Sequence, residues 1–405
     1  MKKYFRLFEE CYLHIEENNC AVYNTFSGKV YVINIQEARL LAILENNFSI
    51  EEIIQTHNIG ENFINETLNK FSEEGLGTYY DTPIYVAKLV SNYDFNDKLF
   101  FKTPPDLRKV VIKLSNICEH DCKSCSQDKI NMLQCISCNE SNENKQVISK
   151  QIFTDIIDKV KKTDCKLLQI KIPDITYNFD YFFDLLLELK NCNFSIMLLL
   201  GSDRMDDHAR EKLDGLGFFI SVQKRVSSQY DVDEICEYLE KSKRFNNFSQ
   251  IILLIEASKK YDLDLKGIIS YMESINVMID YVYDLPEFEN QYQKVKNKYI
   301  SEIPNIDIHT YGLKKFYNGC LYGQIYIDCF GRVFPCAGLV DFELGTIENL
   351  HNLWTDQLIF KFWKLKKSCI KKCKDCALNN ACNDCRALPY KVKKDLMEGM
   401  DCGIC

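Results

Sequence analysis

Short apolar runs alternate with amphipathic segments through the middle of the chain. Six runs are predicted to be buried strands, at residues 110–116, 166–172, 194–201, 218–224, 249–257 and 276–285. Helical patterns lie between them. In residues 148–162, for example, Ile152, Ile156, Ile157 and Val160 recur on one helical face. Six such units predict an α/β fold with a parallel sheet covered by helices, and ligands of such sheets bind at the carboxyl ends of the strands.

The pattern before residue 90 is different. Residues 12–34 read as strands, with a hairpin turn at Ser27-Gly28. Two helices are expected to follow, and Ser49 with Glu52 forms a capping box that starts the second. Strands followed by helices predict a separate winged-helix-like unit.

The pattern changes again from about residue 301. Two strand patterns, at residues 324–328 and 332–336, flank Cys329-Phe330-Gly331 and predict a β-hairpin. Residues 344–367 are then expected to form one amphipathic helix whose apolar stripe packs against a core.

These changes of pattern predict four parts. They are an N-terminal winged-helix-like domain at 1–89, a linker at 90–108, the strand–helix series at 109–300 and a cysteine-rich domain at 301–405.

Composition and charge restrict the function classes. Of 405 residues, 46% are hydrophobic and 27% charged, as in soluble globular proteins, and no apolar run approaches a membrane span. The N-terminus has no secretory signal, so a cytoplasmic location is predicted. A net charge of −8 argues against general nucleic-acid binding. Residues 1–89 carry 7 Lys and Arg against 13 Asp and Glu, which disfavours DNA and favours a peptide added to a sheet edge.

Twenty cysteines are clustered along the chain. Only Cys11 and Cys20 precede Cys118, whereas ten lie from Cys320 onward. Cytosolic thiols stay reduced, so this clustering indicates metal ligation rather than disulfides.

Three cysteines follow the first predicted strand directly. Cys118, Cys122 and Cys125 are spaced C-x3-C-x2-C. Three thiolates can hold three irons of a [4Fe–4S] cluster and leave the fourth iron open for chemistry. One alternative is a four-thiolate zinc site, because Cys135 and Cys138 add a second C-x2-C pair. That second pair is also a candidate for a separate metal site or for a hydrogen-atom donor.

This loop after a strand resembles the cluster loop of the radical S-adenosylmethionine (SAM) superfamily. The resemblance implies an open partial (β/α)6 barrel. It also implies that the open iron chelates SAM, and that reduction of the sulfonium releases a 5′-deoxyadenosyl radical. The family's Gly-Gly-Glu-Pro stretch is replaced here by Lys-Ile-Pro-Asp-Ile at 171–175, which makes Asp174 the candidate for the SAM amino group. Ser221 is the candidate for the ribose, and Glu256 for substrate or cofactor.

The C-terminal cysteines resemble the SPASM extension of radical SAM peptide maturases, which holds auxiliary [4Fe–4S] clusters. The matching order is a cysteine, a hairpin with Gly-x4-Cys, a C-x2-C-x5-C run with a further cysteine, and late cysteines. By resemblance, the first auxiliary cluster takes Cys320, Cys336 and Cys385, with Cys329 as a candidate fourth ligand. The second takes Cys373, Cys376 and Cys382, with Cys402 or Cys405. No cysteine lies shortly before Cys320, which leaves the first ligand set open.

The combined resemblance implies a radical SAM oxidoreductase that modifies a ribosomally made precursor peptide. The bond formed would be a thioether or carbon–carbon cross-link, and the N-terminal domain would recognise the leader. Implied partners are the precursor peptide, a flavodoxin or ferredoxin as electron donor, and an ATP-grasp enzyme or transporter. Two alternatives remain: a catalytically degenerate relative that binds a peptide for a partner enzyme, and a zinc-dependent scaffold.

Overall fold

A computed structural model of the chain describes most of its residues. The described residues are 3–17, 19–90, 106–119, 128–133, 135–136, 145–201, 205–242, 247–259, 263–265, 268, 276–296, 305–355 and 358–400. Five cysteines with predicted metal roles lie outside these ranges: Cys122, Cys125, Cys138, Cys402 and Cys405. Of the helices within these ranges, none has both the length and the apolar character needed to cross a bilayer.

Six parallel strands form the centre of the largest sheet. Each pairs with the next of the six along the chain. They are β6 (Lys109–Lys113), β8 (Leu167–Ile172), β9 (Ser195–Leu200), β10 (Phe219–Val226), β11 (Phe248–Glu256) and β12 (Asn276–Asp284). The predicted strands and their parallel arrangement are therefore confirmed, and the fold is a mixed α/β fold with a large, mainly parallel sheet.

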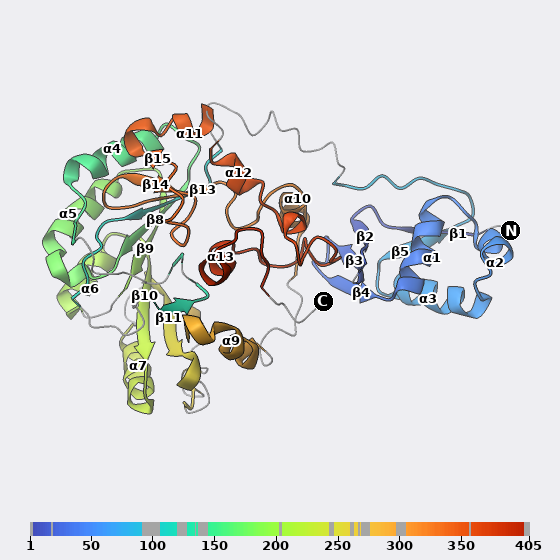
Figure 1. Ribbon diagram of the computed structural model, residues 1–405, viewed down its shortest axis with the longest axis horizontal. Helices are drawn as coiled ribbons and strands as arrows, with labels where there is room; N and C mark the ends of the chain where they lie inside the picture. Colours follow the sequence, from blue (N-terminus) through green and yellow to red (C-terminus); the bar gives the residue numbers. More distant parts are fainter. Residues whose placement is uncertain are drawn as a thin grey trace.

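Helices between these strands cover one face of the sheet (Figure 1). They are α4 (Lys150–Val160), α5 (Phe179–Leu189), α6 (Asp207–Asp214) and α7 (Gln229–Ser242). The buried face of α4 consists of Phe153, Ile156, Ile157 and Val160, so Phe153 takes the place predicted for Ile152. Apolar side chains of the helices and of alternate strand positions pack together, which leaves the opposite face of the sheet for polar residues.

Both edges of the parallel sheet are extended by other segments. At one edge, β7 (Lys129–Asn131) pairs antiparallel with β12. At the other, β13 (Gln324–Ile327) runs parallel to β6, followed by antiparallel β14 (Arg332–Phe334) and β15 (Gly345–Thr346). The predicted hairpin is confirmed, and Gly331 in its turn has φ 80°, a conformation that glycine adopts without strain. The C-terminal region thus continues the same sheet.

The single helix predicted over residues 344–367 is wrong. After β15 the chain forms a short 3-10 helix (Ile347–Asn349), then α11 (Asn352–Thr355) and α12 (Phe360–Trp363). Pairing of β15 with β14 fixes the first residues as strand. In α12, Phe360, Phe362 and Trp363 are all buried. The core therefore surrounds this short helix, whereas an amphipathic helix would bury only one apolar face.

The N-terminal part has two small sheets and three helices rather than two. The strands are β1 (Tyr4–Leu7) paired with β5 (Gly77–Tyr80), and the meander β2 (Cys11–Ile15), β3 (Cys20–Asn24) and β4 (Val30–Ile33). The helices are α1 (Ile35–Glu45), α2 (Ile50–Thr56) and α3 (Glu61–Glu73). The predicted capping box is present at Ser49 and Glu52, and the predicted hairpin turn contains Gly28 at φ 79°. The first predicted helix is α1, which Asn34 starts with a capping box of its own, and the second is divided into α2 and α3.

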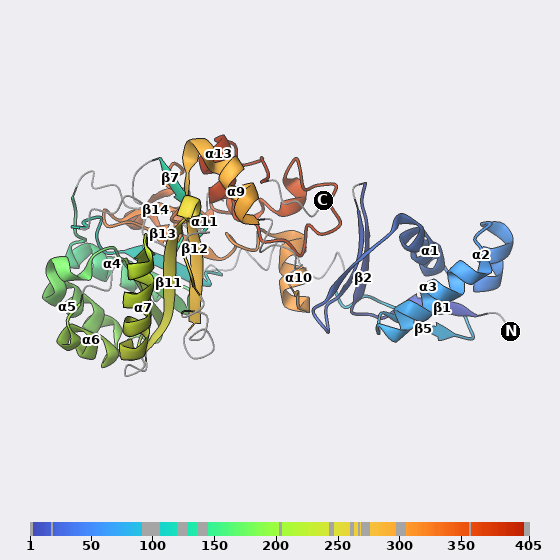
Figure 2. The ribbon, with the colours of Figure 1, turned by 90° about the horizontal axis from the view of Figure 1, so that it is seen from below.

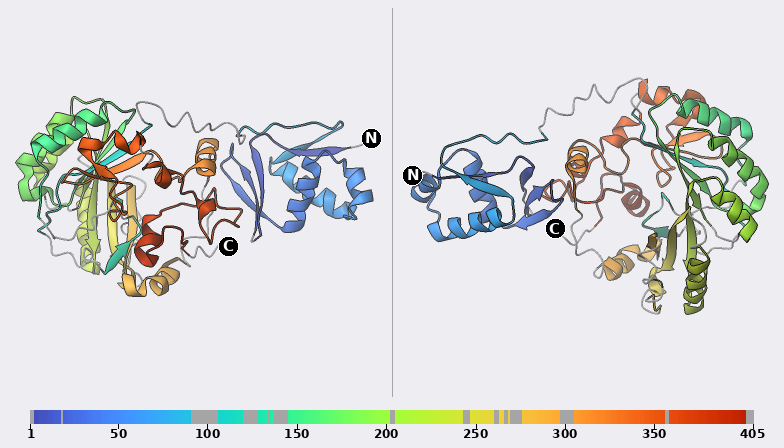
Figure 3. Two further views of the ribbon diagram at one scale, coloured as in Figure 1. Left: turned by 45° about the horizontal axis from the view of Figure 1, so that its top comes forward. Right: turned by 180° about the vertical axis from the view of Figure 1, so that it is seen from behind.

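The meander joins the N-terminal part to the C-terminal region. Figures 2 and 3 show its strands beside α10 (Ile308–Phe316) and the loops near the C-terminus. The backbone N–H of Ile306 donates to the carbonyl of Gly28 over 2.7 Å, and the Tyr23 hydroxyl donates to the carbonyl of Ala377 over 2.7 Å. Buried aromatic and small apolar side chains from both sides form one shared core. The contact is therefore a packed interface.

Candidate functional site

Cys118 lies beyond the carboxyl end of β6, and hydrogen bonds fix the backbone of the segment 115–117 that leads to it. Ser115 bridges Val147, the backbone N–H of Gln146 donates to Asn116 Oδ1 over 2.6 Å, and that of Ile117 donates to Ser115 Oγ over 2.9 Å. Cys118 itself is buried. Its position at the edge where ligands of parallel sheets bind agrees with the expectation from the sequence.

Asp174 links the ends of the first two parallel strands. It follows β8, the neighbour of β6, and its carboxylate is buried. Its Oδ2 accepts a hydrogen bond of 3.2 Å from the backbone N–H of Glu119, directly after Cys118. Its Oδ1 accepts from the N–H and hydroxyl of Thr176, at 3.1 and 2.7 Å, and so caps a 3-10 helix (Ile175–Asn178). A carboxylate thus stands beside the cysteine loop, while its predicted contact with SAM stays a prediction.

The inner face of the sheet, opposite the helices, is unusually polar for a buried surface. Five buried side chains project from alternate positions of β6, β8 and β10: Lys113, Gln169, Lys171, Ser221 and Gln223. Polar residues at period two within a strand would have revealed this face, because alternate side chains point to the same side.

Two of the predicted site residues on this face have partners within the sheet. Ser221 donates its hydroxyl hydrogen bond to Gln250 Oε1 over 3.1 Å. Glu256 forms an ion pair of 2.7 Å with Arg225 from the neighbouring strand. Both side chains of that pair are about one-fifth exposed (22% and 19%), so the charges lie at the rim of the sheet. Roles for Ser221 and Glu256 in binding SAM or substrate remain predictions.

Asp280 on β12 is a functional candidate that the sequence analysis missed. Its carboxylate accepts from the side-chain amide of Asn131 and from the backbone N–H groups of Met132 (3.0 Å) and Leu133 (3.1 Å). Burial raises the pKa of Asp280 to about 6, although these hydrogen bonds oppose the shift. Asp280, an aspartate in the middle of the apolar run 276–285, was the available signal. Its structural effect is to fix the loop that carries Cys135.

Cys320, Cys336 and Cys385, predicted as one ligand set, are brought together. Burial raises the pKa of all three thiols. The neighbouring thiols of Cys385 and Cys336 raise the pKa of Cys320 further, and Cys385 has the same effect on Cys336. Cys329, the candidate fourth member, is buried beside the hairpin turn and lies near Arg332.

The second predicted set lies against the N-terminal meander. The side-chain amide of Asn19 donates to Cys376 Sγ over 3.6 Å. Burial raises the pKa of the Tyr23 hydroxyl, and the thiols of Cys382 and Cys376 raise it further. Cys373 Sγ lies 3.4 Å from the position that a Cβ at Gly399 would take. The cysteine run 373–382 is therefore enclosed between the N-terminal sheet and the segment before the C-terminus.

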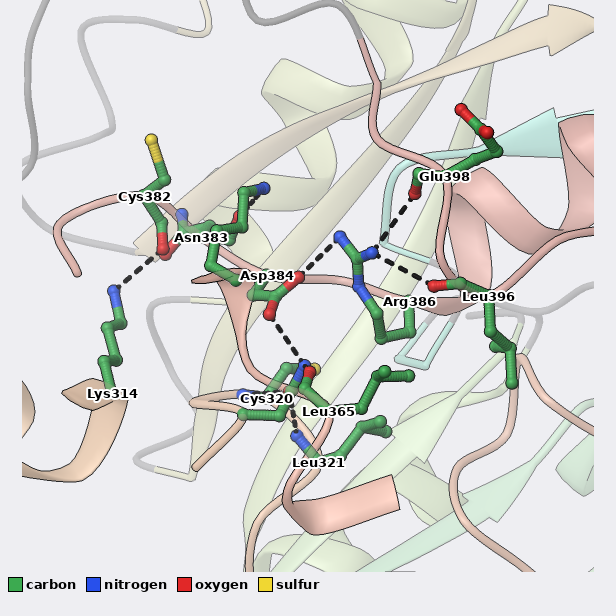
Figure 4. A network of polar contacts seen from close by, with 12 residues as sticks. Lys314, Cys320, Leu321, Leu365, Cys382, Asn383, Asp384, Arg386, Leu396 and Glu398 are labelled. Atoms are coloured by element: carbon green, nitrogen blue, oxygen red, sulfur yellow. Dashed lines mark hydrogen bonds and ion pairs between the residues drawn. The ribbon is translucent and has the colours of Figure 1, made fainter. Parts of the chain in front are cut away.

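A buried polar network holds both sets in place (Figure 4). Asp384 and Arg386 form an ion pair with almost no exposure of either side chain (3% and 1%). Asn318 donates to Asp384 Oδ2 over 2.9 Å, while its own Oδ1 accepts from the backbone N–H of Cys320 over 2.9 Å. The backbone on both sides of Cys385 is thereby fixed and connected to Cys320.

The same network extends to neighbouring elements. Arg386 donates to the carbonyls of Leu396 (3.3 Å) and Glu398 (3.2 Å). Lys314 on α10 donates to the carbonyls of Ala381 (3.0 Å) and Cys382 (3.2 Å). Sequence reasoning missed these residues, since they lie between cysteines and resemble ordinary surface charges there.

A single zinc ion and a four-iron cluster require different spacings of their thiolate ligands. In the parts of the chain that the structure covers, no three His, Cys, Asp or Glu side chains lie close enough to hold one metal ion. A zinc ion needs its sulfurs about 4 Å apart, because each Zn–S bond is about 2.3 Å. A four-iron cluster spaces its thiolate ligands more widely, and cluster ligation by the two predicted sets stays a prediction. The predicted zinc set of Cys122, Cys125, Cys135 and Cys138 lies mostly outside the described residues.

Comparison with known proteins gives matches among solved structures. No family model matches the chain, and no curated protein matches its sequence. SuiB from Streptococcus suis is similar over 98% of this chain and 99% of its own, at 13% identity and a TM-score of 0.47. SuiB has also been solved bound to precursor peptide SuiA, again at a TM-score of 0.47 and with 14% identity. Native anSMEcpe with bound AdoMet and Kp18Cys peptide is similar over 72% of this chain and 92% of its own, at 13% identity and a TM-score of 0.50.

At such low identity the similarity concerns the fold, and function has to be argued from the site. The resemblance stated from the cysteine motifs is confirmed to this extent: the chain has the fold of the radical SAM peptide maturases.

Proposed function

We propose that the chain is a radical SAM maturase that cross-links a ribosomally made precursor peptide through a thioether or carbon–carbon bond. The N-terminal part, residues 1–89, holds the leader of the peptide. Residues 109–300 form the catalytic partial barrel, joined by the linker 90–108, and residues 301–405 form the SPASM domain.

One observation carries this proposal. Cys118 lies at the carboxyl end of the first of six parallel strands, and Asp174 from the next strand bonds to the residue beside it. Reductive cleavage of SAM needs two groups at one place: an iron with an open coordination position, and a carboxylate that binds the SAM amino group. The first strand's cysteine loop and the second strand's carboxylate supply these groups side by side.

The ligand assignments belong to the proposal. Cys118, Cys122 and Cys125 hold the cluster with an open iron, which on reduction supplies a 5′-deoxyadenosyl radical from SAM. Two auxiliary clusters are held by the sets described above, with Cys402 or Cys405 completing the second.

The chain's own residues orient the reactants and keep water out. The buried polar face, with Lys113 and Lys171 near the strand ends, offers hydrogen bonds to a cofactor without exposing it. The interface between the meander and α10 keeps the leader-binding part attached, which raises the effective concentration of a flexible peptide.

The proposed partners are those that the family resemblance implies. A flavodoxin or ferredoxin supplies electrons, and an ATP-grasp enzyme or a transporter acts on the same peptide. The site of action is the cytoplasm.

Cleavage of SAM tests the proposal. The full chain is purified anaerobically and incubated with SAM and dithionite, and 5′-deoxyadenosine is measured by liquid chromatography. We expect turnover by the wild type and only background from Cys118→Ala. Cys192→Ala is the matched control, because Cys192 is a partly buried cysteine just after α5 and its substitution should leave turnover unchanged.

A catalytically degenerate peptide-binding protein is the alternative function, motivated by the absent glycine motif at 171–175. Wild-type protein that carries iron but yields no more 5′-deoxyadenosine than Cys118→Ala would favour it. A protein that contains zinc and no iron would exclude both functions.

A further inference from the structure

The loop that carries Cys135 is anchored at both of its ends. β7 pairs antiparallel with β12, which folds the following residues back over the inner face of the sheet. Asp280 accepts from the N–H groups of Met132 and Leu133. On the other side, Gln223 of β10 donates to the carbonyl of Ile136 over 2.7 Å. Cys135 is thus held at a fixed place above the sheet.

Packing brings this loop to the C-terminal cysteines. Ile130 is buried in one apolar cluster with Leu388 of α13 (Ala387–Lys393), and both Met132 and Cys385 pack against that cluster. Ile136 packs against a neighbouring cluster on the inner face of β11 and β12. The loop therefore adjoins the start of α13, where Cys385 lies two residues before the helix.

Cys385 is in turn connected to Cys320. Asn318 donates to Asp384, the residue before Cys385, and its Oδ1 accepts from the backbone N–H of Cys320. The loop that carries Cys135 therefore adjoins the first auxiliary set.

We propose that Cys135 is the fourth protein ligand of the first auxiliary cluster, together with Cys320, Cys336 and Cys385. The proposal rests on the proposed function, which places an iron–sulfur cluster on the latter three. It accounts for the missing cysteine before Cys320, because the fourth thiolate would come from the barrel loop. The cluster would then connect the barrel directly to the C-terminal region, and all four of its irons would have protein ligands.

Iron content distinguishes Cys135 from Cys329, the other buried candidate. Three clusters correspond to about twelve irons per chain. We expect anaerobically purified Cys135→Ala to lose about four of them, and Cys329→Ala to keep all. Loss in Cys329→Ala with retention in Cys135→Ala would overturn the proposal, as would full retention in both. If the wild type has no iron, or Cys320→Ala keeps as much as the wild type, the auxiliary cluster itself is refuted.

Alkylation gives a readout that does not depend on the stability of a variant. Full-length wild-type protein is treated with iodoacetamide before and after removal of iron by a chelator, and labelled peptides are measured by mass spectrometry. Cys135 should be protected while iron is bound and labelled afterwards. Cys236 on α7, partly buried and far from the cysteine groups in sequence, should be labelled equally in both states. Equal labelling of Cys135 in both states would overturn the assignment.

Discussion

The Nε2 atom of His14 lies 2.7 Å from the hydroxyl oxygen of Tyr311, across the interface between the N-terminal meander and α10. Burial, and to a smaller extent the positive charge of Lys315, lowers the pKa of His14 to about 4. His14 is therefore neutral at pH 7, and its ring can accept the tyrosine hydrogen bond. The rings of Tyr12 and Tyr23 pack around the same pair, with centroids 4.4 and 5.3 Å from that of Tyr311.

Removing this hydrogen bond should loosen the interface. We expect Tyr311→Phe to lower the free energy of unfolding by about 1–2 kcal/mol, because the buried imidazole of His14 loses its partner while the ring packing stays. Urea unfolding and hydrogen exchange in β2 and β3 measure the change. Tyr177→Phe, at an exposed tyrosine, is the control and should be neutral. Faster exchange in the parallel strands of the large sheet, with unchanged exchange in the meander, would contradict the assignment.

The interface should also weaken in acid. The pKa of His14 in the folded chain is depressed, so the unfolded chain binds its proton more readily. Stability from neutral His14 is therefore present above the ordinary pKa of about 6.5 and is lost as pH falls towards 4. The full loss corresponds to about 3 kcal/mol. Comparing the wild type with His14→Gln between pH 7 and 4 isolates this contribution. Parallel pH profiles for the two proteins would refute it.

The buried ion pair of Asp384 and Arg386 predicts that removing only the cation costs more stability than removing both charges. Arg386→Met leaves the Asp384 carboxylate buried without its cation, which should cost about 3–5 kcal/mol. Adding Asp384→Asn should recover much of that loss, because an asparagine oxygen can still accept from Asn318. Thermal unfolding measures both.

An exposed lysine offers the matched control for this pair. Lys371 forms ion pairs with Asp395 and Glu398 at the surface, so Lys371→Met should leave the melting temperature unchanged. If the double variant is no more stable than Arg386→Met, the loss comes from the carbonyls of Leu396 and Glu398 rather than from the carboxylate.

The sequence predicted those elements that depend on local patterns. The six parallel strands, the hairpin around Gly331 and the capping box of Ser49 and Glu52 each arise from residues close together in the chain. The segment 344–367 could not be predicted in this way. Its apolar residues suit an amphipathic helix, but pairing of β15 with β14 and burial of Trp363 on all sides decide its structure.

The candidate site was predictable only in part for the same reason. The clustering of cysteines indicated metal ligation, and the resemblance to the SPASM extension grouped Cys320, Cys336 and Cys385 as one predicted set. Their supports could not, since Asn318 and Asp384 are 66 residues apart in the chain. Asp280 and Asn131 are 149 apart. Only the folded sheet shows that these polar residues position the cysteine loops.

Asp174 allows the SAM-binding part of the proposal to be tested without removing a cluster ligand. Asp174→Asn keeps the size of the side chain and one carbonyl oxygen, but removes the negative charge that would meet the SAM amino group. Loss of one charge-assisted hydrogen bond costs about 1.5–3 kcal/mol, so the affinity for SAM should fall roughly 10- to 100-fold. Equilibrium dialysis of iron-loaded protein measures the affinity.

Asp206→Asn is the matched control for this variant. Asp206 also follows a barrel strand and caps a helix through its carboxylate, which accepts from the N–H of Ala209 over 2.7 Å. If both substitutions lower stability alike and neither changes SAM affinity, Asp174 acts only as a helix cap that supports the cysteine loop. A selective loss of affinity in Asp174→Asn, with equal melting temperatures, would make it a cofactor-binding residue in place of the absent glutamate.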